Sequence, residues 1–392
     1  MTSKAYPPNW ANDDAIRTAA SCWWRLGLLE QAQHTAILAA HPASYYQTSL
    51  WIRVVLFGAT LLGGITALGF LLLTTSGDLN PLVYGIAVLL GCLILLESLI
   101  KNSHHYRSGV DNALLFGALL AWAFLVGYVG RDTFSGSLTS PTLWLWLVPV
   151  LVALLGALVR YADPLVAATS FVAILALLAN ILLQSTLGQL LLPFGVMAAA
   201  GALLLMLRRL PARPDYFYYH SAGLVLRMLG LAVLYLAGNY LVVREGNAQL
   251  LGSGGPSAQI PLAPLFYVCT AIIPLVYIVL GLRRHDRLPL TLGLLALAFS
   301  LFTLRYYRQV LPPEVAAALS GVVLLLGALA ALRYLRTPRH GLTTAVDGAA
   351  TPHFNLESLV VAQTAYVPTA PTETGFQFGG GQSGGGGAES SY

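Results

Sequence analysis

Charged residues are scarce in this sequence. Only 9% of its 392 residues are Asp, Glu, Lys or Arg, whereas a soluble globular domain carries about 25%. Hydrophobic residues make up 57% of the chain, and they gather into apolar runs of about 20 residues, the length that crosses a hydrocarbon core of roughly 30 Å. The scarcity of charge therefore excludes an ordinary soluble protein and predicts an integral membrane protein.

Cysteine is also rare, and motifs for catalysis or metal binding are missing. Three cysteines without a Cys-x-x-Cys spacing indicate neither a disulfide framework nor a zinc ribbon. The chain contains no His-Glu-x-x-His and no phosphate-binding Gly-x-x-x-x-Gly-Lys-Ser/Thr motif, which metalloproteases and ATP-driven pumps require. We therefore predict a protein that is not an enzyme and has no catalytic residues, no metal site and no cofactor.

Apolar runs occupy most of the chain between residues 52 and 335. They are continuously apolar instead of alternating at every second residue, which excludes transmembrane β-strands. The sequence therefore predicts an all-α, polytopic transmembrane helical bundle of about ten spans. The predicted spans are 52–74, 82–100, 112–130, 142–160, 164–185, 187–207, 222–243, 261–282, 288–305 and 314–334.

The distribution of basic residues predicts the topology. If the N-terminus is cytoplasmic, 17 of the 21 Lys and Arg residues fall on the cytoplasmic side of the ten predicted spans, as the positive-inside rule requires. Both termini are then predicted to be cytoplasmic. The net charge of +5 therefore reflects topology and the lipid bilayer as partner, and no nucleic-acid partner is predicted.

Three regions are predicted along the chain. Residues 1–43 read as a cytoplasmic helical pair that packs on itself, on the cytoplasmic loops or on a protein partner. Residues 44–339 form the ten-span transmembrane domain. Residues 340–392 contain no long apolar run and end in a glycine-rich stretch, so they gain too little burial to offset chain entropy. We predict a disordered cytoplasmic tail there.

Similar segments recur in the same order in the two halves of the predicted bundle. "YYQTSLWIR" (45–53) resembles "YYHSAGLVLR" (218–227), and "LLGALVRYADP" (154–164) resembles "LLGALAALRYLRTP" (325–338). Spans 1–4 and 7–10 therefore read as copies. A shift by six helices preserves orientation, so the sequence predicts a parallel four-helix repeat with its axis along the membrane normal.

Three segments, one near the N-terminus and two near the end of the span array, carry a resemblance to known proteins. "WRLGLLEQ" (24–31) ahead of an array of spans resembles the cytoplasmic helical pair of a widespread group of bacterial integral membrane proteins classified only as domains of unknown function. The pair of segments "RHDRLPLTLGLLALAFSLFTLRYYRQ" (284–309) and "ALSGVVLLLGALAALRYL" (318–335) is similar to that group's C-terminal unit. The resemblance implies a location in the bacterial inner membrane and no defined activity.

Ionisable residues inside spans are functional candidates because they are expensive to place in a membrane. Glu97 and Arg227 are the two candidates, and both lie near the predicted cytoplasmic ends of their spans. Glu97 is either a boundary residue paired with Lys101 at i+4 or a functional acid. A functional role for both residues would take the form of a Glu97–Arg227 ion pair.

Other polar residues give weaker candidates. Asn180 and Asn239 lie in the outer parts of their spans, where amides either bond between helices or contact a substrate. His104 and His105 are neighbours that point about 100° apart on a helix, so they cannot hold a metal jointly. We expect His104 and His105 to be solvated loop residues. The alternative is a composite metal site that also includes His34, His41 and His220.

The sequence favours a non-enzymatic membrane protein that acts as an envelope scaffold or sensor. The alternative is a secondary transporter of a small neutral or amphipathic molecule, which the prolines within spans would serve by exposing backbone groups. A polar-lined cavity between the two four-helix units would favour transport, whereas a solidly packed apolar interior would favour the scaffold or sensor.

Overall fold

The computed structural model describes most of the membrane-like part of the chain. The described residues are 4–46, 48–133, 137–250, 259–260, 262–284 and 286–308, with eight isolated positions between 315 and 333. The chain divides into two units, Met1–Val346 and Asp347–Tyr392. The predicted tail, 340–392, and most of the predicted tenth span, 314–334, lie outside the described residues.

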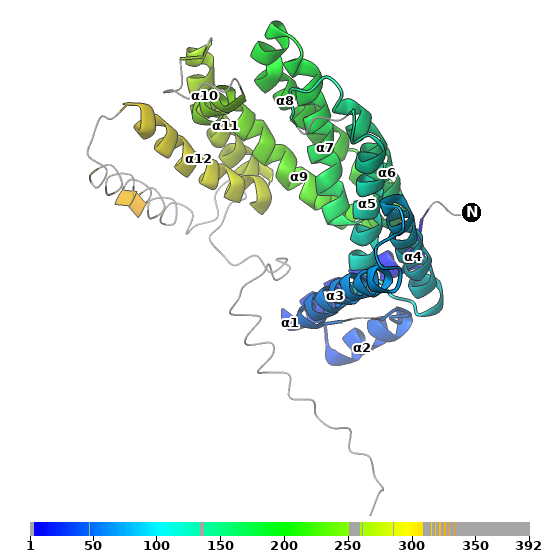
Figure 1. Cartoon of the computed structure of the whole chain (residues 1–392). Coiled ribbons are helices and arrows are strands. Elements are labelled where there is room, and N and C mark those ends of the chain that lie inside the picture. The colour runs from blue at the N-terminus through cyan, green and yellow to red at the C-terminus, as the bar shows by residue number, and fades with distance from the viewer. Residues whose placement is uncertain are drawn as a thin grey trace, which may run out of the picture. The chain divides into compact units, whose positions relative to one another are not determined.

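The described residues are almost entirely helical (Figure 1). The helices are α1 (Pro8–Arg25), α2 (Gln31–Ala40), α3 (Leu50–Thr74), α4 (Pro81–Asn102), α5 (Val110–Val129), α6 (Trp144–Tyr161), α7 (Pro164–Leu183), α8 (Thr186–Leu207), the 3-10 turn η1 (Leu210–Ala212), α9 (Tyr216–Gly238), α10 (Tyr240–Leu250), α11 (Ala263–Arg284) and α12 (Arg287–Arg308). This confirms the predicted all-α class.

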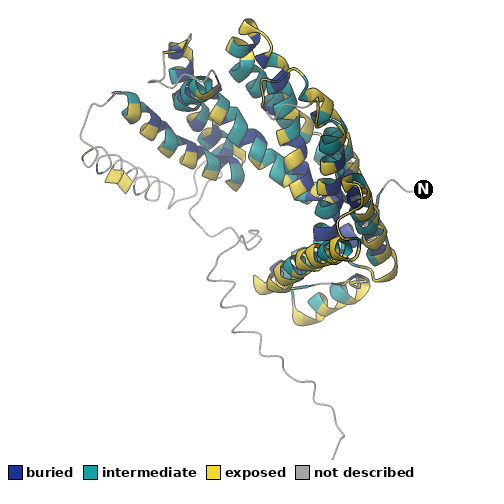
Figure 2. Cartoon of the chain, viewed as in Figure 1, coloured by how far each residue is buried: buried dark blue, intermediate teal, exposed yellow. Residues whose placement is uncertain are grey.

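Nine of these helices, α3–α9 with α11 and α12, are long and apolar enough to cross a membrane. They correspond to the first nine predicted spans, and most of their ends differ from the prediction by a few residues. Large apolar side chains face outward along them, most completely on α3, which has no buried residue (Figure 2). Such faces are stable against hydrocarbon and would be unfavourable in water.

The seventh predicted span, 222–243, was placed incorrectly at both ends. α9 begins at Tyr216, because the aromatic residues before position 222 continue the helix and pack inward through the buried Tyr218. The helix then ends at Gly238, and Asn239 adopts an extended conformation. The side-chain oxygen of Asn239 accepts hydrogen bonds from the backbone N–H groups of Leu241 and Val242 in α10, as an N-cap does. Residues 244–250 are therefore helical, although they lie between the seventh and eighth predicted spans.

Four connections lie at a common end of the array, which we call the basic end: 103–109, 162–163, 208–215 and the connection between α11 and α12, of which Asp286 is described. Asn112 Nδ2 donates to Asp163 Oδ2 at 2.6 Å, and Arg107 Nη1 donates to Ser221 Oγ at 2.7 Å. The basic residues at or near this end are Arg53, Lys101, Arg107, Arg160, Arg208, Arg209, Arg213, Arg227, Arg283, Arg284 and Arg287. The charge asymmetry seen in the sequence therefore belongs to one end of the structure.

Helix α9 joins the two groups of spans. It packs on α7 and α8 on one side and on α11 and α12 on the other, and it also contacts α1 (Figure 1). Consecutive helices from α4 to α9 pack as antiparallel neighbours, as do α11 and α12. Because α9 is shared, any space between the two groups is lined by α9.

The N-terminal segment packs into the basic end. Tyr6, Trp10 and Ala11 are buried in the same apolar cluster as residues of α4–α7 and α9. The backbone N–H of Ala5 donates to the carbonyl of Arg160 at 2.9 Å, and α1 also packs on α2. Of the packing modes predicted for residues 1–43, the structure shows packing within the helical pair and packing on the basic-end connections.

Candidate functional site

Glu97 is held in a charged network at the basic end of α4. Arg160 donates to Glu97 Oε1 from Nη2 at 2.6 Å and from Nε at 3.0 Å, and the Tyr161 hydroxyl donates to the same oxygen at 2.8 Å. Lys101 Nζ lies 3.7 Å from Oε2, which confirms the predicted i,i+4 pair. The Glu97–Arg227 pair considered as the functional alternative is not formed, because Arg160 at the end of α6 binds Glu97 and Asp286 binds Arg227.

Asn180 ties a connection to a helix. Its Nδ2 donates to the carbonyl oxygens of Leu138 and Ser140, both at 2.8 Å, and its side chain is buried. These carbonyls belong to the connection between α5 and α6. The residue therefore acts through hydrogen bonds between segments, which was one of the two sequence alternatives for this amide.

Asn239 is the centre of a buried neutral network. Its Nδ2 donates to the Tyr235 hydroxyl at 2.9 Å and lies 3.1 Å from Thr303 Oγ1. Tyr235 lies 2.8 Å from Ser300 Oγ, and Ser300 donates to the carbonyl of Thr270 at 2.6 Å. The network thus connects α9, α11 and α12 and fixes the break before α10. The Asn239 amide therefore forms hydrogen bonds between helices, which was one of the two alternatives for it from the sequence.

Two buried aspartates at the basic end were missed by sequence reasoning. Asp111 is 1% exposed and accepts hydrogen bonds from the Tyr6 hydroxyl at 2.8 Å and from three backbone N–H groups, those of Arg107, Ser108 and Gly109. Asp163 accepts from Leu165 N and Val166 N as the N-cap of α7. The sequence signals were an acid in the first turn of a helix and an acid directly before a proline.

Burial changes the ionisation of this cluster. Desolvation, and then the negative charge of Asp111, raise the pKa of the Tyr6 hydroxyl well above its usual value. Desolvation also raises the pKa of Asp163, although the N–H groups of α7 act in the opposite direction. Tyr6 therefore remains a neutral donor to Asp111 at ordinary pH, and the N-terminal segment is held by this bond.

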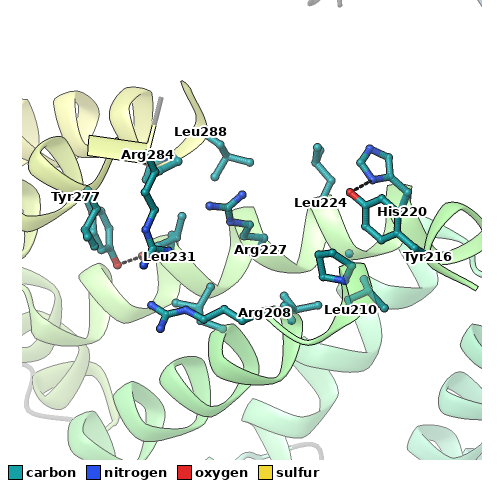
Figure 3. A pocket seen from close by; sticks show the side chains of 16 residues that line it. Arg208, Leu210, Tyr216, His220, Leu224, Arg227, Leu231, Tyr277, Arg284 and Leu288 are labelled. Carbon is teal, nitrogen blue, oxygen red and sulfur yellow. Dashed lines mark hydrogen bonds between the residues drawn. The ribbon is translucent and has the colours of Figure 1, made fainter. Parts of the chain in front are cut away.

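A second group of charged residues surrounds an open cavity at the basic end. Arg208 at the end of α8, Arg227 on α9 and Arg284 at the end of α11 line a cavity of about 320 Å³ (Figure 3). The remaining lining residues are Leu204, Leu207, Leu210, Pro211, Tyr216, His220, Gly223, Leu224, Leu231, Tyr277, Leu280, Leu288 and Pro289. We call this space the arginine cavity. Its volume lies within the usual range for small-molecule sites.

The three arginines differ in their pairing. Arg227 Nη2 forms an ion pair with Asp286, whose other carboxylate oxygen accepts the N–H of Leu288 at 3.1 Å. Within the described part of the chain, neither Arg208 nor Arg284 forms an ion pair with an acidic side chain. The cavity therefore carries a net positive charge of about two, arising from side chains on two different helices.

The floor of the arginine cavity is apolar. Its floor consists of Leu204, Leu231 and Leu280, which lie four residues farther from the basic end than the arginines on α8, α9 and α11. The Tyr277 hydroxyl donates to the carbonyl of Leu231 at 2.8 Å. At the rim, His220 Nδ1 lies 2.9 Å from the Tyr216 hydroxyl (Figure 3). A site that combines cations with leucines one turn farther from the basic end is suited to an anion that carries an apolar group.

Two further hollows are mainly apolar. One of about 400 Å³ lies between α8, α9 and α10, and it includes Gln189 and Asn247 among its lining residues. Another of about 710 Å³ lies between α4, α5 and α6, with Glu97, Arg160 and Tyr161 at its basic end. The charges of this second hollow are already paired with one another, which distinguishes it from the arginine cavity.

The histidines make separate contacts. His105 Nδ1 lies 2.9 Å from Ser108 Oγ, His41 Nδ1 lies 2.9 Å from Asp13 Oδ1, and the ring of His34 stacks on Trp24. His104 packs against Trp10, while His220 lines the arginine cavity. The composite histidine site considered from the sequence is therefore not assembled by these five residues.

Comparison with known proteins adds no further assignment. The chain matches no protein-family model, no curated protein sequence and no solved structure. The case for a function therefore depends on the fold, in which nine described helices have the length and composition of membrane spans, and on the geometry of the arginine cavity.

Proposed function

We propose that this protein is a non-enzymatic membrane sensor or scaffold that recognises an anionic amphiphile in the arginine cavity. The observation that carries the proposal is the convergence of Arg208, Arg227 and Arg284 on one space with a leucine floor. Cations that only mark topology can extend separately into the headgroup region. Cations that gather around a concave, partly apolar space provide both halves of a site for an amphiphile.

The charge distribution supports a location for this site. The positive-inside rule favours a cytoplasmic basic end, with both termini cytoplasmic, in a bacterial inner membrane as the sequence resemblance implies. Anionic lipids of a cytoplasmic leaflet attract basic residues near its surface. The arginine cavity would then lie where an anionic headgroup is available.

A scaffold or sensor also needs a surface for a protein partner. The α1–α2 pair offers one, since Trp23, Trp24 and Leu28 are 48%, 44% and 68% exposed. The same pair is attached to the basic end through Tyr6 and Ala5. We propose that a partner binds this outward side of residues 1–43, while the inward side stays on the membrane domain.

The alternative function is a secondary transporter of a small neutral or amphipathic molecule. It is favoured by the 400 Å³ hollow, which lies farther along α9 than the arginine cavity and between the same α8 and α9 helices. The scaffold or sensor has more support, because the buried polar side chains around Asn239 bond to one another instead of facing a cavity.

Charge-neutralising variants test the proposed function. Replacing Arg208 and Arg284 together (R208Q/R284Q) removes two cavity cations, whereas R209Q/R283Q removes the same charge from neighbouring exposed positions that do not line the cavity. We expect the first variant, held in mixed micelles, to bind added anionic lipid at least about tenfold more weakly than wild type, because charge-assisted arginine bonds are lost. Equal losses in both variants would refute the proposed site and indicate non-specific attraction.

A further inference from the structure

We propose that the ligand of the arginine cavity is a lipid phosphomonoester, an amphiphile whose headgroup ends in a terminal phosphate. This inference rests on the proposed function and specifies its ligand class. It follows from three properties of the cavity: its net charge, the directions from which its arginines approach, and its apolar floor.

The charge of the cavity favours a dianionic headgroup. Asp286 neutralises Arg227, so Arg208 and Arg284 supply the two positive charges that remain. A phosphomonoester carries about −1.5 to −2 at pH 7, while a phosphodiester or a carboxylate carries a single negative charge. A terminal phosphate therefore balances both cations, whereas a diester headgroup leaves one of them unbalanced.

The geometry favours a headgroup with several free oxygens. Arg208 lies at the end of α8 and Arg284 at the end of α11, and in Figure 3 they reach the cavity from opposite sides of Arg227. Each guanidinium presents a planar fork of N–H donors that binds phosphate oxygens in pairs. A terminal phosphate has three unesterified oxygens to share between two such forks, and a diester has only two.

The floor favours a lipid over free phosphate. Leu204, Leu231 and Leu280 line the space farther from the basic end than the arginines, and an inorganic anion would leave that surface without a partner. An acyl chain attached to the phosphate would cover it and remove apolar area from water. The shared chemistry is the terminal phosphate, and the apolar surface assigns its source to the membrane.

The experiment uses the purified full-length protein and three probes. The protein is held in phosphatidylcholine mixed micelles, and binding is measured to added phosphatidic acid, a lipid phosphomonoester, or phosphatidylglycerol, a phosphodiester, with total lipid charge matched. Inorganic phosphate is added as a competitor. We expect about tenfold tighter binding to phosphatidic acid than to phosphatidylglycerol, a preference that R208Q/R284Q loses and R209Q/R283Q retains. Phosphate at millimolar concentration should not displace the bound phosphatidic acid.

Each other outcome overturns a defined part of the proposal. Equal binding of both anionic lipids, lost only in R208Q/R284Q, would overturn the phosphomonoester assignment while supporting the proposed function. No difference between the binding of anionic and neutral lipids would overturn both the phosphomonoester assignment and the proposed function. Displacement by inorganic phosphate would overturn the lipid source. If R208Q/R284Q does not fold, R208K/R284K keeps the charge but removes the planar forks, and an undiminished preference in that variant would overturn the two-fork geometry.

Discussion

The two sides of α9 use polar residues differently. In α4–α7, together with residues 4–11, charged groups bond to each other and to backbone N–H groups: Glu97 binds Arg160, and Asp111 binds Tyr6. In α9–α12, the buried bonds join neutral groups such as Asn239 and Thr303. On that side, cations at the basic end face a cavity.

This difference separates structural from functional charge. A buried charge is tolerated when it is paired and fully hydrogen-bonded, and Asp111 meets that condition through four donors besides the Ser108 hydroxyl. A cation that has no acidic partner and lies beside an open space can form ion pairs and hydrogen bonds with a ligand. The first pattern describes the basic end of α4–α7, and the second describes the arginine cavity.

The predicted repeat matches arginines and acids in the two groups of helices. Arg53 and Arg227 occupy matching positions in the two similar segments. Arg227 pairs with Asp286 just before α12, whereas the acid near the start of α5, Asp111, binds Tyr6 and backbone groups. The helix pairs α4/α5 and α11/α12 each pack together, but the repeat itself stays a prediction. The N-terminal segment therefore binds an acid in the first half only, where Tyr6 donates to Asp111.

Replacing Asp111 should have the largest effect on stability. D111N puts an amide, itself a donor, opposite three backbone N–H groups and the Tyr6 hydroxyl. We expect a loss of about 3 kcal/mol in the free energy of unfolding, as for other buried acceptors left unmatched. The measurements are denaturant titration in mixed micelles and the labelling rate of the buried Cys22 thiol on α1, which should rise.

The matched control is D132N, because the Asp132 side chain is 90% exposed. That variant should unfold as the wild type does and leave the labelling rate of Cys22 unchanged. If D111N also unfolded and reacted at Cys22 as the wild type does, the hydrogen bonds of Asp111 would not stabilise the basic end of α4–α7.

Replacing Asn239 tests the neutral half. N239A removes the N-cap of α10 and the bonds to Tyr235 and Thr303. We expect a loss of about 2 kcal/mol in the free energy of unfolding, combining the loss of a cap with that of bonds between helices. The exposed Asn102 provides the control, and N102A should change the free energy by less than about 0.5 kcal/mol. A similar loss of unfolding free energy in N239A and N102A would contradict a stabilising role for the buried network around Asn239.

A double-mutant cycle between Glu97 and Arg160 should show the smallest effect. Their side chains are 25% and 38% exposed, so solvent screening reduces the energy of the pair. We expect a coupling free energy of about 1 kcal/mol between E97Q and R160Q, measured by unfolding of the single and double variants. The same cycle for Glu97 and Arg227 should give a coupling close to zero, and a larger value would restore the pairing predicted from sequence.

Several features were accessible from sequence because they depend on chain-local properties. Span length and polarity predicted the helices, and the i,i+4 spacing predicted the Glu97–Lys101 contact. The break at Asn239 was missed, because an asparagine within an apolar run gives no local sign of whether it caps a new helix. The Glu97–Arg160 pair was also missed, since it joins residues 63 positions apart, and many such pairings are compatible with one span pattern.

The sequence by itself determined the all-α class, the membrane-spanning character and the concentration of basic residues at alternate connections, because these follow from composition along a helix. Only the tertiary structure decided which charges find partners. It paired Glu97 with Arg160 and Arg227 with Asp286, and it brought Arg208 and Arg284 to one cavity. The physical reason is that pairing and cavity formation depend on how α9 packs between two groups of helices, and local sequence does not specify that packing.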